Sequence, residues 1–477
     1  MKNKILSLFL LSALAISTAS AQTYAHGRSS TYTWPKDKQV LEKLDKWQDQ
    51  KFGMLIHFGL YSQLGIVESW SICAEEEDWI PRDSTITYDD YKRQYWNTIN
   101  EFKPDKLNPS AWAAYGKKAG MNYAVFTTKH HDGFNLFDTK QSDFSIANGA
   151  FRNDPRKNVA KEVFNAFRDQ GYMIGAYYSK PDWHSQYYWW DRYATPTRNN
   201  NYDTEKNSWR WGKFKEFTYN QIEELMNGDY GSIDILWLDG GWVRPAREND
   251  GQRAGKAYKG AQDIDMPKIA AMARRHQPGL LVVDRTVPGE YENYQTPERG
   301  IPETQLENPW ESCITLGWDW GYVPTDQYKS PATVVHTLVE IVAKGGSLLL
   351  GIGPRPDGTL PQAVEQRLEK IGEWTLKNGE AIYNTRITPV YNDGSTWFTQ
   401  SKDGKKIYAI TNLEEGKPLP KTIVWKGNEP IKGSKVIFLQ TGKTVSWKKT
   451  ANGIEVNVPK GLPADQPALA FSFVTEK

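Results

Sequence analysis

The chain has 477 residues, of which 39% are hydrophobic and 24% are charged, as in an ordinary globular protein. Its 59 lysines and arginines nearly balance its 57 aspartates and glutamates, so the formal net charge of +2 gives no basic surface of the kind that binds nucleic acid or an acidic membrane. Two cysteines, Cys73 and Cys313, are too few for a disulfide-rich scaffold, and the sequence leaves open whether they pair. The 20 Trp and 25 Tyr favour a carbohydrate ligand, because an aromatic face with a polar tip suits a sugar ring, although such residues also fill large cores.

Residues 1–21 have the pattern of a secretory signal peptide. Lysines precede the apolar run Ile5–Ile16, and the small residues Ala19–Ala21 precede an expected cleavage before Gln22. A membrane anchor is the alternative, but a span needs about 20 apolar residues and this run is shorter. We therefore expect an exported protein, periplasmic or extracellular, without a membrane span.

From residue 22 to residue 384, short apolar runs alternate with amphipathic helix patterns. This alternation predicts parallel strands joined by helices, and over this length an α/β fold with a (β/α)8-like, TIM-type barrel. Two strands of a regular barrel are hard to place, so we expect an irregular one. The predicted strands are Phe52–Phe58, Tyr123–Thr127, Met173–Tyr178, Ile233–Leu238, Leu280–Val283 and Ser347–Gly351, and the predicted helices include Pro109–Ala119, Asn158–Gln170 and Pro267–His276.

Residues 385–477 have a different pattern, in which short segments alternate apolar and polar residues with a period of two. Asp403-Gly404 and Asn452-Gly453 lie between such segments and are strong signals for hairpin turns. The tail is therefore predicted to be a small antiparallel β-sandwich that supports the barrel. Its expected strands are Trp397–Ser401, Lys406–Thr411, Thr422–Trp425, Lys435–Leu439, Ile454–Val458 and Ala468–Val474.

A candidate catalytic carboxylate ends one predicted strand of the barrel, where such folds carry their chemistry. Asp239 follows the run Ile233–Leu238 and precedes two glycines and Trp242. Capping of the next helix is the alternative role for an aspartate at a strand end, but the glycines allow a ligand to come close. We therefore expect Asp239 at the mouth of the barrel. A partner carboxylate is expected in the proline-punctuated loop Val287–Gln305, and spacing does not choose among Glu290, Glu292, Glu298 and Glu303.

Histidines follow two other predicted strands. His57 ends one of them, where a core histidine is the alternative interpretation, and His130 and His131 follow Tyr123–Thr127. Adjacent residues on an extended segment point to opposite sides, so one histidine of the pair is expected to face a ligand and the other to support it. A metal site is the competing interpretation, but the chain contains neither an HExxH nor a CxxC motif.

Short motifs follow one another along the chain as far as about Pro361. They are Phe52-Gly53 with His57-Phe58-Gly59, Thr128–Phe134, Tyr177-Tyr178-Ser179, Trp237–Gly240, Thr296-Pro297-Glu298, Pro309-Trp310-Glu311 with Trp320-Gly321-Tyr322, and Lys344–Gly346 with Gly353-Pro354 and Asp357-Gly358. Each motif alone is weak, but the ordered set resembles the family 29 glycoside hydrolases, the α-L-fucosidases.

The resemblance implies roles for particular residues. Asp239 matches the nucleophile of the family, and Glu298 matches the acid/base of many members. Trp70 and Trp320 are expected to border the same pocket, although Trp70 stands in Glu68-Ser69-Trp70, where the family more often has adjacent Glu and Trp. The resemblance implies no metal and no organic cofactor. Residues that match positions holding the fucose hydroxyls or the nucleophile are His57, His130, His131, Tyr178 and Arg285.

The activity that the resemblance implies is that of an exo-acting, retaining α-L-fucosidase. Such an enzyme releases terminal L-fucose from fucosylated oligosaccharides or glycoconjugates, here through a fucosyl-Asp239 intermediate, and its two carboxyl groups lie about 5–5.5 Å apart. Arg285 and a neighbouring histidine are expected to keep Asp239 ionised. Alternatives are an enzyme of the same family restricted to α-1,3/1,4 linkages, a metal-dependent hydrolase on the same scaffold, and a non-catalytic glycan-binding protein, which would not need both carboxylates. The oligomeric state is left open.

Overall fold

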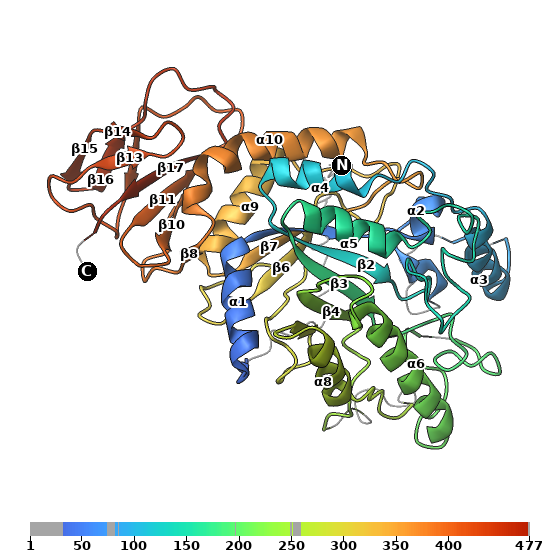
Figure 1. Ribbon diagram of the computed structural model, residues 1–477. Helices are drawn as coiled ribbons and strands as arrows, with labels where there is room; N and C mark the ends of the chain where they lie inside the picture. Colours follow the sequence, from blue (N-terminus) through green and yellow to red (C-terminus); the bar gives the residue numbers. More distant parts are fainter. Residues whose placement is uncertain are drawn as a thin grey trace, which may run out of the picture.

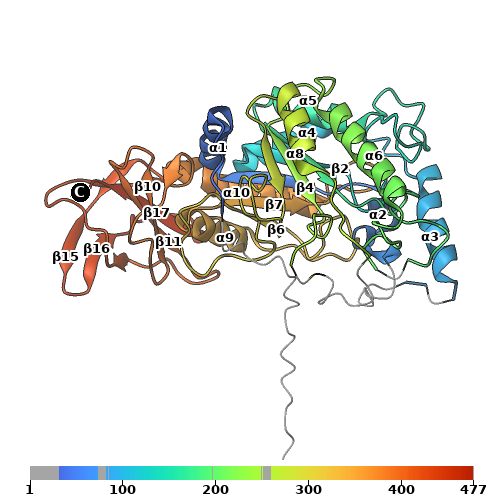
Figure 2. The same cartoon turned by 90° about the horizontal axis from the view of Figure 1, so that it is seen from below.

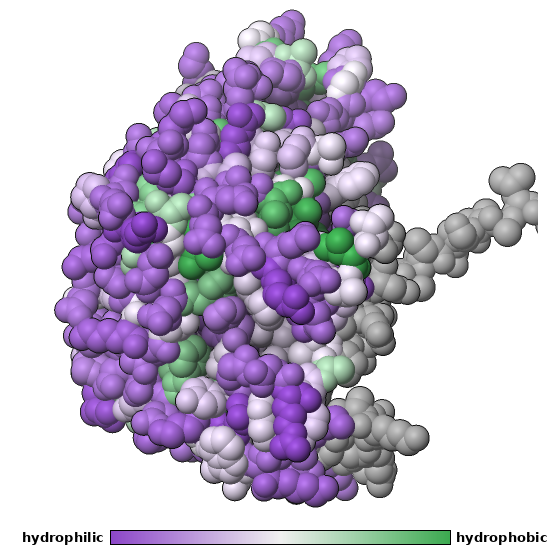
Figure 3. Space-filling view, turned by 90° about the vertical axis from the view of Figure 1, so that its right-hand side faces the viewer, coloured by the Kyte–Doolittle hydropathy of each residue, from purple (hydrophilic) through white to green (hydrophobic). Residues whose placement is uncertain are grey.

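A computed structural model describes residues 32–73, 82–83, 85–195, 197–248, 250 and 259–475. The predicted signal peptide, residues 1–21, lies outside the described residues. The described chain consists of a parallel sheet surrounded by helices, with a group of antiparallel strands beside it that forms the C-terminal end (Figure 1; Figure 2). The face of the helical part seen in Figure 3 is mostly hydrophilic, and its apolar residues form small separate patches.

The central sheet has seven parallel strands in the order β5-β4-β3-β2-β1-β7-β6. Nearly all residues of these strands are buried, which explains why they read as continuous apolar runs rather than as alternating ones. The expected barrel fold is therefore confirmed, and the six predicted strands correspond to β1–β5 and β7. The bounds are β1 Phe52–Ile56, β2 Tyr123–Lys129, β3 Met173–Ser179, β4 Ile235–Asp239, β5 Leu281–Asp284, β6 Glu311–Thr315 and β7 Ser347–Ile352.

The sheet closes irregularly between its edge strands β5 and β6. In place of a further strand, the segment that follows β5 lies beside both edges. Glu292 forms an antiparallel bridge with Val283 of β5, and Glu298 forms a parallel bridge with Cys313 of β6. β6 could not be predicted, because Glu311–Thr315 contains a glutamate and two hydroxyl residues and no apolar run.

Helices cover the outside of the barrel (Figure 1). α4 shows how the sequence sets their ends: the Asn108 side chain accepts a hydrogen bond from the Ala111 N–H, Pro109 is the first residue, and Gly120 ends the helix at a φ of 92°. No helix of the described ranges is long and apolar enough to cross a membrane. The bounds are α1 Lys38–Gln50, α2 Leu60–Leu64, α3 Tyr88–Asn97, α4 Pro109–Ala119, α5 Val159–Asp169, α6 Ser208–Met226, α8 Met266–His276, α9 Pro331–Ala343 and α10 Gln362–Asn378.

Two antiparallel sheets follow α10, and their inner faces share a core that includes Phe398, Trp425 and Phe471. The hairpins predicted at Asp403-Gly404 and Asn452-Gly453 join β10 to β11 and β15 to β16. The larger sheet also contacts the helical part, because Trp374 Nε1 of α10 donates to the Ala468 carbonyl at 2.8 Å. The strands are β8 Thr385–Arg386, β9 Asn392–Asp393, β10 Thr396–Ser401, β11 Ile407–Asn412, β12 Thr422–Trp425, β13 Val436–Phe438, β14 Lys443–Val445, β15 Trp447–Thr450, β16 Gly453–Asn457 and β17 Ala468–Phe473.

Candidate active site

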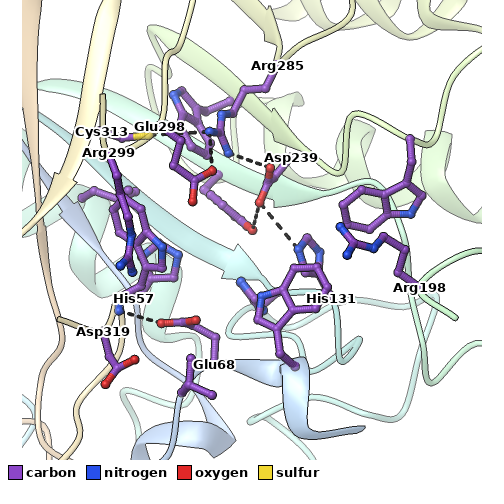
Figure 4. Close-up of a pocket in the computed structure, with 18 residues that line it drawn as sticks. His57, Glu68, His131, Arg198, Asp239, Arg285, Glu298, Arg299, Cys313 and Asp319 are labelled. Atoms are coloured by element: carbon purple, nitrogen blue, oxygen red, sulfur yellow. Dashed lines mark hydrogen bonds and ion pairs between the residues drawn. The ribbon is translucent and has the colours of Figure 1, made fainter. Parts of the chain in front are cut away.

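A pocket of about 150 Å³ opens at the carboxyl ends of the parallel strands (Figure 4). This volume is well below the roughly 300–1,000 Å³ of pockets that hold drug-sized ligands, so the pocket suits a single small ring. Its lining comes from strand ends and from the loops that follow them. The lining residues are Leu55, His57, Val67, Glu68, Trp70, His130, His131, Tyr177, Arg198, Trp237, Asp239, Trp242, Arg285, Glu298, Arg299, Cys313, Asp319 and Trp320.

Asp239 is the last residue of β4 and lies at the centre of the polar contacts in the pocket. Its Oδ1 accepts from Arg285 Nη1 at 2.7 Å, and its Oδ2 accepts from the Tyr177 hydroxyl at 2.8 Å and lies 3.6 Å from His131 Nε2. Burial alone would raise the pKa of Asp239, but the Arg285 guanidinium, His131, the Tyr177 hydroxyl and the Gly240 N–H hold it well below its usual range. Asp239 is therefore an ionised carboxylate, as the sequence predicts.

Arg285 joins the two candidate carboxylates. It directly follows β5, and while Nη1 contacts Asp239, Nη2 donates to Glu298 Oε2 at 3.0 Å. Its Nε donates to Thr296 Oγ1 at 3.2 Å, and the guanidinium carbon lies 4.3 Å from the centre of the Trp237 ring. A planar fork held at each of its nitrogens fixes the direction of both carboxylates. Figure 4 shows Asp239 and Glu298 on the same side of Arg285, pointing into the pocket.

Glu298 reaches the pocket from the segment that closes the barrel. The next residue, Arg299, has a φ of 51°, a left-handed conformation that a non-glycine residue adopts only under constraint. The Arg299 N–H donates to the Cys313 carbonyl at 2.9 Å, which ties this turn to β6. Of the four glutamates that the sequence left open in this loop, Glu298 is the one that lines the pocket.

His57, His130 and His131 all line the pocket, and their rings lie close together, with 4.4 Å between the ring centres of His130 and His131. Burial lowers the pKa of His130 to about 4 and the pKa values of His57 and His131 well below 6.5, so all three rings are neutral at pH 7. His57 Nδ1 and His131 Nδ1 are buried and have no hydrogen-bond partner in the part of the chain that the structure describes. The expectation that His130 and His131 point to opposite sides is wrong, because β2 ends at Lys129 with a register shift and the pair is no longer extended.

Tyr178 does not line the pocket, and its predicted role is wrong. Its hydroxyl donates to Gln221 Oε1 of α6 at 2.8 Å, on the outer side of the sheet. Tyr177 faces inward instead and contacts Asp239. Side chains alternate along a strand, and because both faces of β3 are apolar, composition did not reveal which tyrosine points inward.

Indole rings and a second set of charges complete the walls. Trp70 and Trp320 line the pocket as the resemblance implies, together with Trp237 and Trp242. Across the pocket from Arg285 lie Glu68 and Asp319 (Figure 4). Burial, reinforced by the charge of Asp319, raises the pKa of Glu68 to about 7.

Sequence reasoning assigned no role to several lining residues. Asp319 and Arg299 directly neighbour two residues that it did assign, Trp320 and Glu298, and this adjacency was the available signal. Arg198 lies in the long connection between β3 and α6, where no sequence pattern marks it. Its guanidinium carbon lies 4.9 Å from the centre of the Trp70 ring.

The architecture is that of a glycoside hydrolase. A parallel barrel carries a small pocket with indole walls, and in it two carboxylates contact one guanidinium beside neutral histidines. Comparison with known proteins agrees. A family model described as Alpha-L-fucosidase matches residues 19–380. The chain is 28% identical over 449 residues to the plasma alpha-L-fucosidase of Pongo abelii, covering 88% of this chain and 87% of that protein. The chain therefore belongs to the alpha-L-fucosidase family, family 29 of the glycoside hydrolases.

Solved structures resemble the whole arrangement. Alpha-L-fucosidase isoenzyme 1 from Paenibacillus thiaminolyticus matches with a TM-score of 0.72 and 28% identity, covering 92% of this chain and 100% of that one. An alpha-L-fucosidase from Bacteroides thetaiotaomicron, described as a covalent intermediate trapped with 2-fluoro-fucosyl fluoride, matches with a TM-score of 0.71 and 21% identity over 94% of this chain and 98% of that one. The barrel with its antiparallel C-terminal sheets is thus shared with structures of fucosidases.

Proposed function

We propose that this α-L-fucosidase is exo-acting and retaining, with Asp239 as nucleophile and Glu298 as acid/base. The observation that carries the proposal is the Arg285 guanidinium, which holds both carboxylates in a pocket with room for one ring. A pocket with room for a single ring favours release of a terminal sugar over cleavage within a glycan chain. The expected substrates are fucosylated oligosaccharides or glycoconjugates.

In the first step, a carboxylate oxygen of Asp239 forms a bond to the anomeric carbon of fucose. The bond from that carbon to the leaving oxygen breaks with its electron pair, and Glu298 gives its proton to that oxygen. The product is a fucosyl-Asp239 ester and a free alcohol.

In the second step, Glu298 removes a proton from water, whose oxygen attacks the anomeric carbon and releases Asp239 as a carboxylate. The Asp239 carboxylate is then part of the ester, so Glu298 is the carboxylate on Arg285 that remains for this proton transfer. The covalent intermediate reported for the Bacteroides relative supports the same course for this chain.

The neutral histidines and Tyr177 are the expected contacts for the fucose hydroxyls and for the nucleophile. The His57 and His131 rings line the pocket beside Asp239, and the indole rings of Trp70 and Trp320 offer apolar surface to the C6 methyl group. Each hydrogen bond to a substrate hydroxyl is worth about 1–3 kcal/mol, because its loss leaves a buried polar group unpaired.

The nucleophile is tested by hydrolysis of 4-nitrophenyl α-L-fucoside and by azide rescue. Asp239→Ala should lose activity, and azide should restore it with β-fucosyl azide as product, since azide then attacks from the side that Asp239 occupied. An active Asp239→Ala enzyme would refute the assignment. A wild type that leaves the aryl fucoside intact but cleaves a Lewis-type trisaccharide would show the α-1,3/1,4-restricted alternative.

The acid/base is tested with the same substrate and with a matched glutamate from the same loop. Glu298→Ala should hydrolyse the substrate slowly, and azide should give α-fucosyl azide, because attack then occurs on the fucosyl-Asp239 ester. Glu303→Gln is the control, since this side chain is exposed and does not line the pocket. Loss of activity in Glu303→Gln with little change in Glu298→Ala would show that Glu298 is not the acid/base.

We also propose export to the periplasm or the outside of the cell, on the strength of the pattern in residues 1–21. The mature protein should begin at Gln22 when its N-terminus is determined from fractionated cells and medium. Recovery of the protein from the cytoplasm with an intact N-terminus would contradict export.

A further inference from the structure

Trp318 presents its side chain to solvent next to the pocket. It lies in the loop that follows β6 and is 67% exposed, more than any other tryptophan of the described ranges. A single exposed aromatic ring needs no explanation by itself, but a flat exposed indole is a suitable surface for a ligand. The place of Trp318 in the chain, directly before residues that line the pocket, indicates which ligand.

The backbone around Trp318 is held firmly although its side chain is exposed. The Trp318 N–H donates to Asp326 Oδ1 at 2.7 Å. The carbonyl of the preceding Gly317 accepts from Thr315 Oγ1 at 2.7 Å and from Lys329 Nζ at 3.0 Å. The indole therefore stands on a fixed base, so a ligand that stacks on it does not have to order the loop first.

The same loop is anchored to the pocket on the other side of Trp318. The next two residues, Asp319 and Trp320, both line the pocket. The N–H groups of Trp320 and Gly321 donate to Glu68 Oε1 at 2.6 and 3.0 Å, and the Glu68 side chain is itself buried in the pocket wall. Consecutive Cα atoms lie about 3.8 Å apart, so the backbone of Trp318 lies one residue away from the wall of the pocket.

The pocket has room for one ring, so the sugar that carries the fucose must lie outside it, over the rim. We infer that Trp318 is a specificity-determining platform for that leaving sugar, a pyranose whose apolar C–H face stacks on the exposed indole. This inference rests on the proposed function, because it takes the ring in the pocket to be fucose. Aromatic faces with a polar tip suit such contact, and the fixed backbone keeps the face in place.

The test compares substrates that differ only in the leaving group. α-L-Fucosyl fluoride has no sugar at this position, whereas fucosyl disaccharides linked α-1,2 to galactose or α-1,3, α-1,4 or α-1,6 to N-acetylglucosamine each have one. In Trp318→Ala, the ratio of kcat/KM for the preferred disaccharide to kcat/KM for the fluoride should fall about tenfold, equivalent to about 1.4 kcal/mol. Trp318→Tyr, which keeps a flat ring, should recover most of this ratio.

The matched control is Trp209→Ala, which removes another exposed indole, 61% exposed, at the start of α6. An unchanged ratio in Trp318→Ala, or the same fall in Trp209→Ala, would overturn the inference while leaving the fucosidase activity established. Equal losses on the fluoride and the disaccharides would overturn it as well, because the ring would then support the pocket itself. A wild type inert towards the fluoride and all four disaccharides would overturn the proposed function and this inference with it.

A binding measurement separates contact from catalysis. In the Asp239→Ala background, calorimetric titration with the preferred disaccharide should show about tenfold weaker binding when Trp318 is also replaced by alanine. Titration with free fucose should give the same dissociation constant with and without the second replacement. Equal weakening of both ligands would contradict the platform.

Discussion

Replacement of Arg285 by glutamine tests the electrostatics on which the mechanism depends. The guanidinium is buried and lies 2.7 Å from Asp239 and 3.0 Å from Glu298. In Arg285→Gln the Asp239 carboxylate stays buried without its cation, and breaking a buried ion pair in this way costs about 3–5 kcal/mol. Protonation of Asp239 removes most of that cost, so Asp239 should be protonated at a higher pH in the variant than in the wild type.

The direction of both expected pH effects follows from the depressed pKa of Asp239 in the wild type. The ionised form is the nucleophile, so activity should begin to fall at a higher pH in the variant as the solution is acidified. A displacement of about 2 pH units corresponds to about 3 kcal/mol. In the wild type the depressed pKa stabilises the fold above the unfolded value of about 3.9, and this stabilisation is still nearly complete at pH 4. In the variant, Asp239 takes up a proton between pH 7 and pH 4, which relieves part of the cost of its unpaired charge, so the variant should be less stable than the wild type by more at pH 7 than at pH 4.

The assay is kcat/KM for 4-nitrophenyl α-L-fucoside between pH 3 and pH 8, with urea unfolding at pH 4 and pH 7. Arg93→Gln is the control, because Arg93 pairs with Asp90 on the exposed side of α3 and lies outside the pocket. The role assigned to this cation would be refuted if kcat/KM of Arg285→Gln fell at the same acidic pH as that of the wild type and the variant were equally destabilised at pH 4 and pH 7.

Three further outcomes are expected. Tyr177→Phe should lower kcat/KM about tenfold or more, because a hydrogen bond to the charged Asp239 is worth about 1.5–3 kcal/mol, whereas Tyr178→Phe should change the melting temperature more than the kinetics. Glu311→Gln should remove a pH dependence of stability, because burial raises the pKa of Glu311 to about 7. The free energy of unfolding of the wild type in urea should fall by about 3 kcal/mol between pH 4.5 and pH 7, and that of the variant should not show this change. His131→Ala should lower turnover strongly while circular dichroism and the unfolding midpoint show a folded protein, and wild-type kinetics would remove this residue from the site.

The strand ends could be predicted from the sequence because the rule that places them is local. A buried parallel strand is an apolar run, and the residue after it lies at the mouth of the barrel. Asp239 and His57 were found in this way, and both line the pocket. The same rule fails for β6, because Glu311–Thr315 is not an apolar run. Glu311 can lie inside the barrel because it accepts hydrogen bonds from the Tyr123 hydroxyl at 2.8 Å and from Trp237 Nε1 at 3.0 Å.

Residues brought in by loops could not be predicted from local pattern. Arg198 and Asp319 reach the pocket from connections of irregular structure, and no periodicity indicates where such a side chain points. Glu298 was singled out among its neighbours by resemblance, and the physical reason for its position is the left-handed turn at Arg299 together with the bridge to Cys313. Tyr177 and Tyr178 show what could not be predicted within a strand. Both faces of β3 are buried, so the sequence shows that the two side chains point to opposite faces but not which of them faces the inside of the barrel.

The neutral state of the pocket histidines has a physical reason that agrees with the reaction. The transition state of glycoside cleavage carries positive charge on the sugar. A charged imidazole about 4 Å from that charge would oppose it by about 4 kcal/mol at an effective dielectric constant of 20. Burial lowers the pKa of His130 to about 4 and the pKa values of His57 and His131 well below their ordinary value, so these rings can contact hydroxyls without adding positive charge. The cation that does touch the nucleophile, Arg285, is paired with Asp239, and the carboxylate of Asp239 is the negative group that faces the positive charge of the transition state.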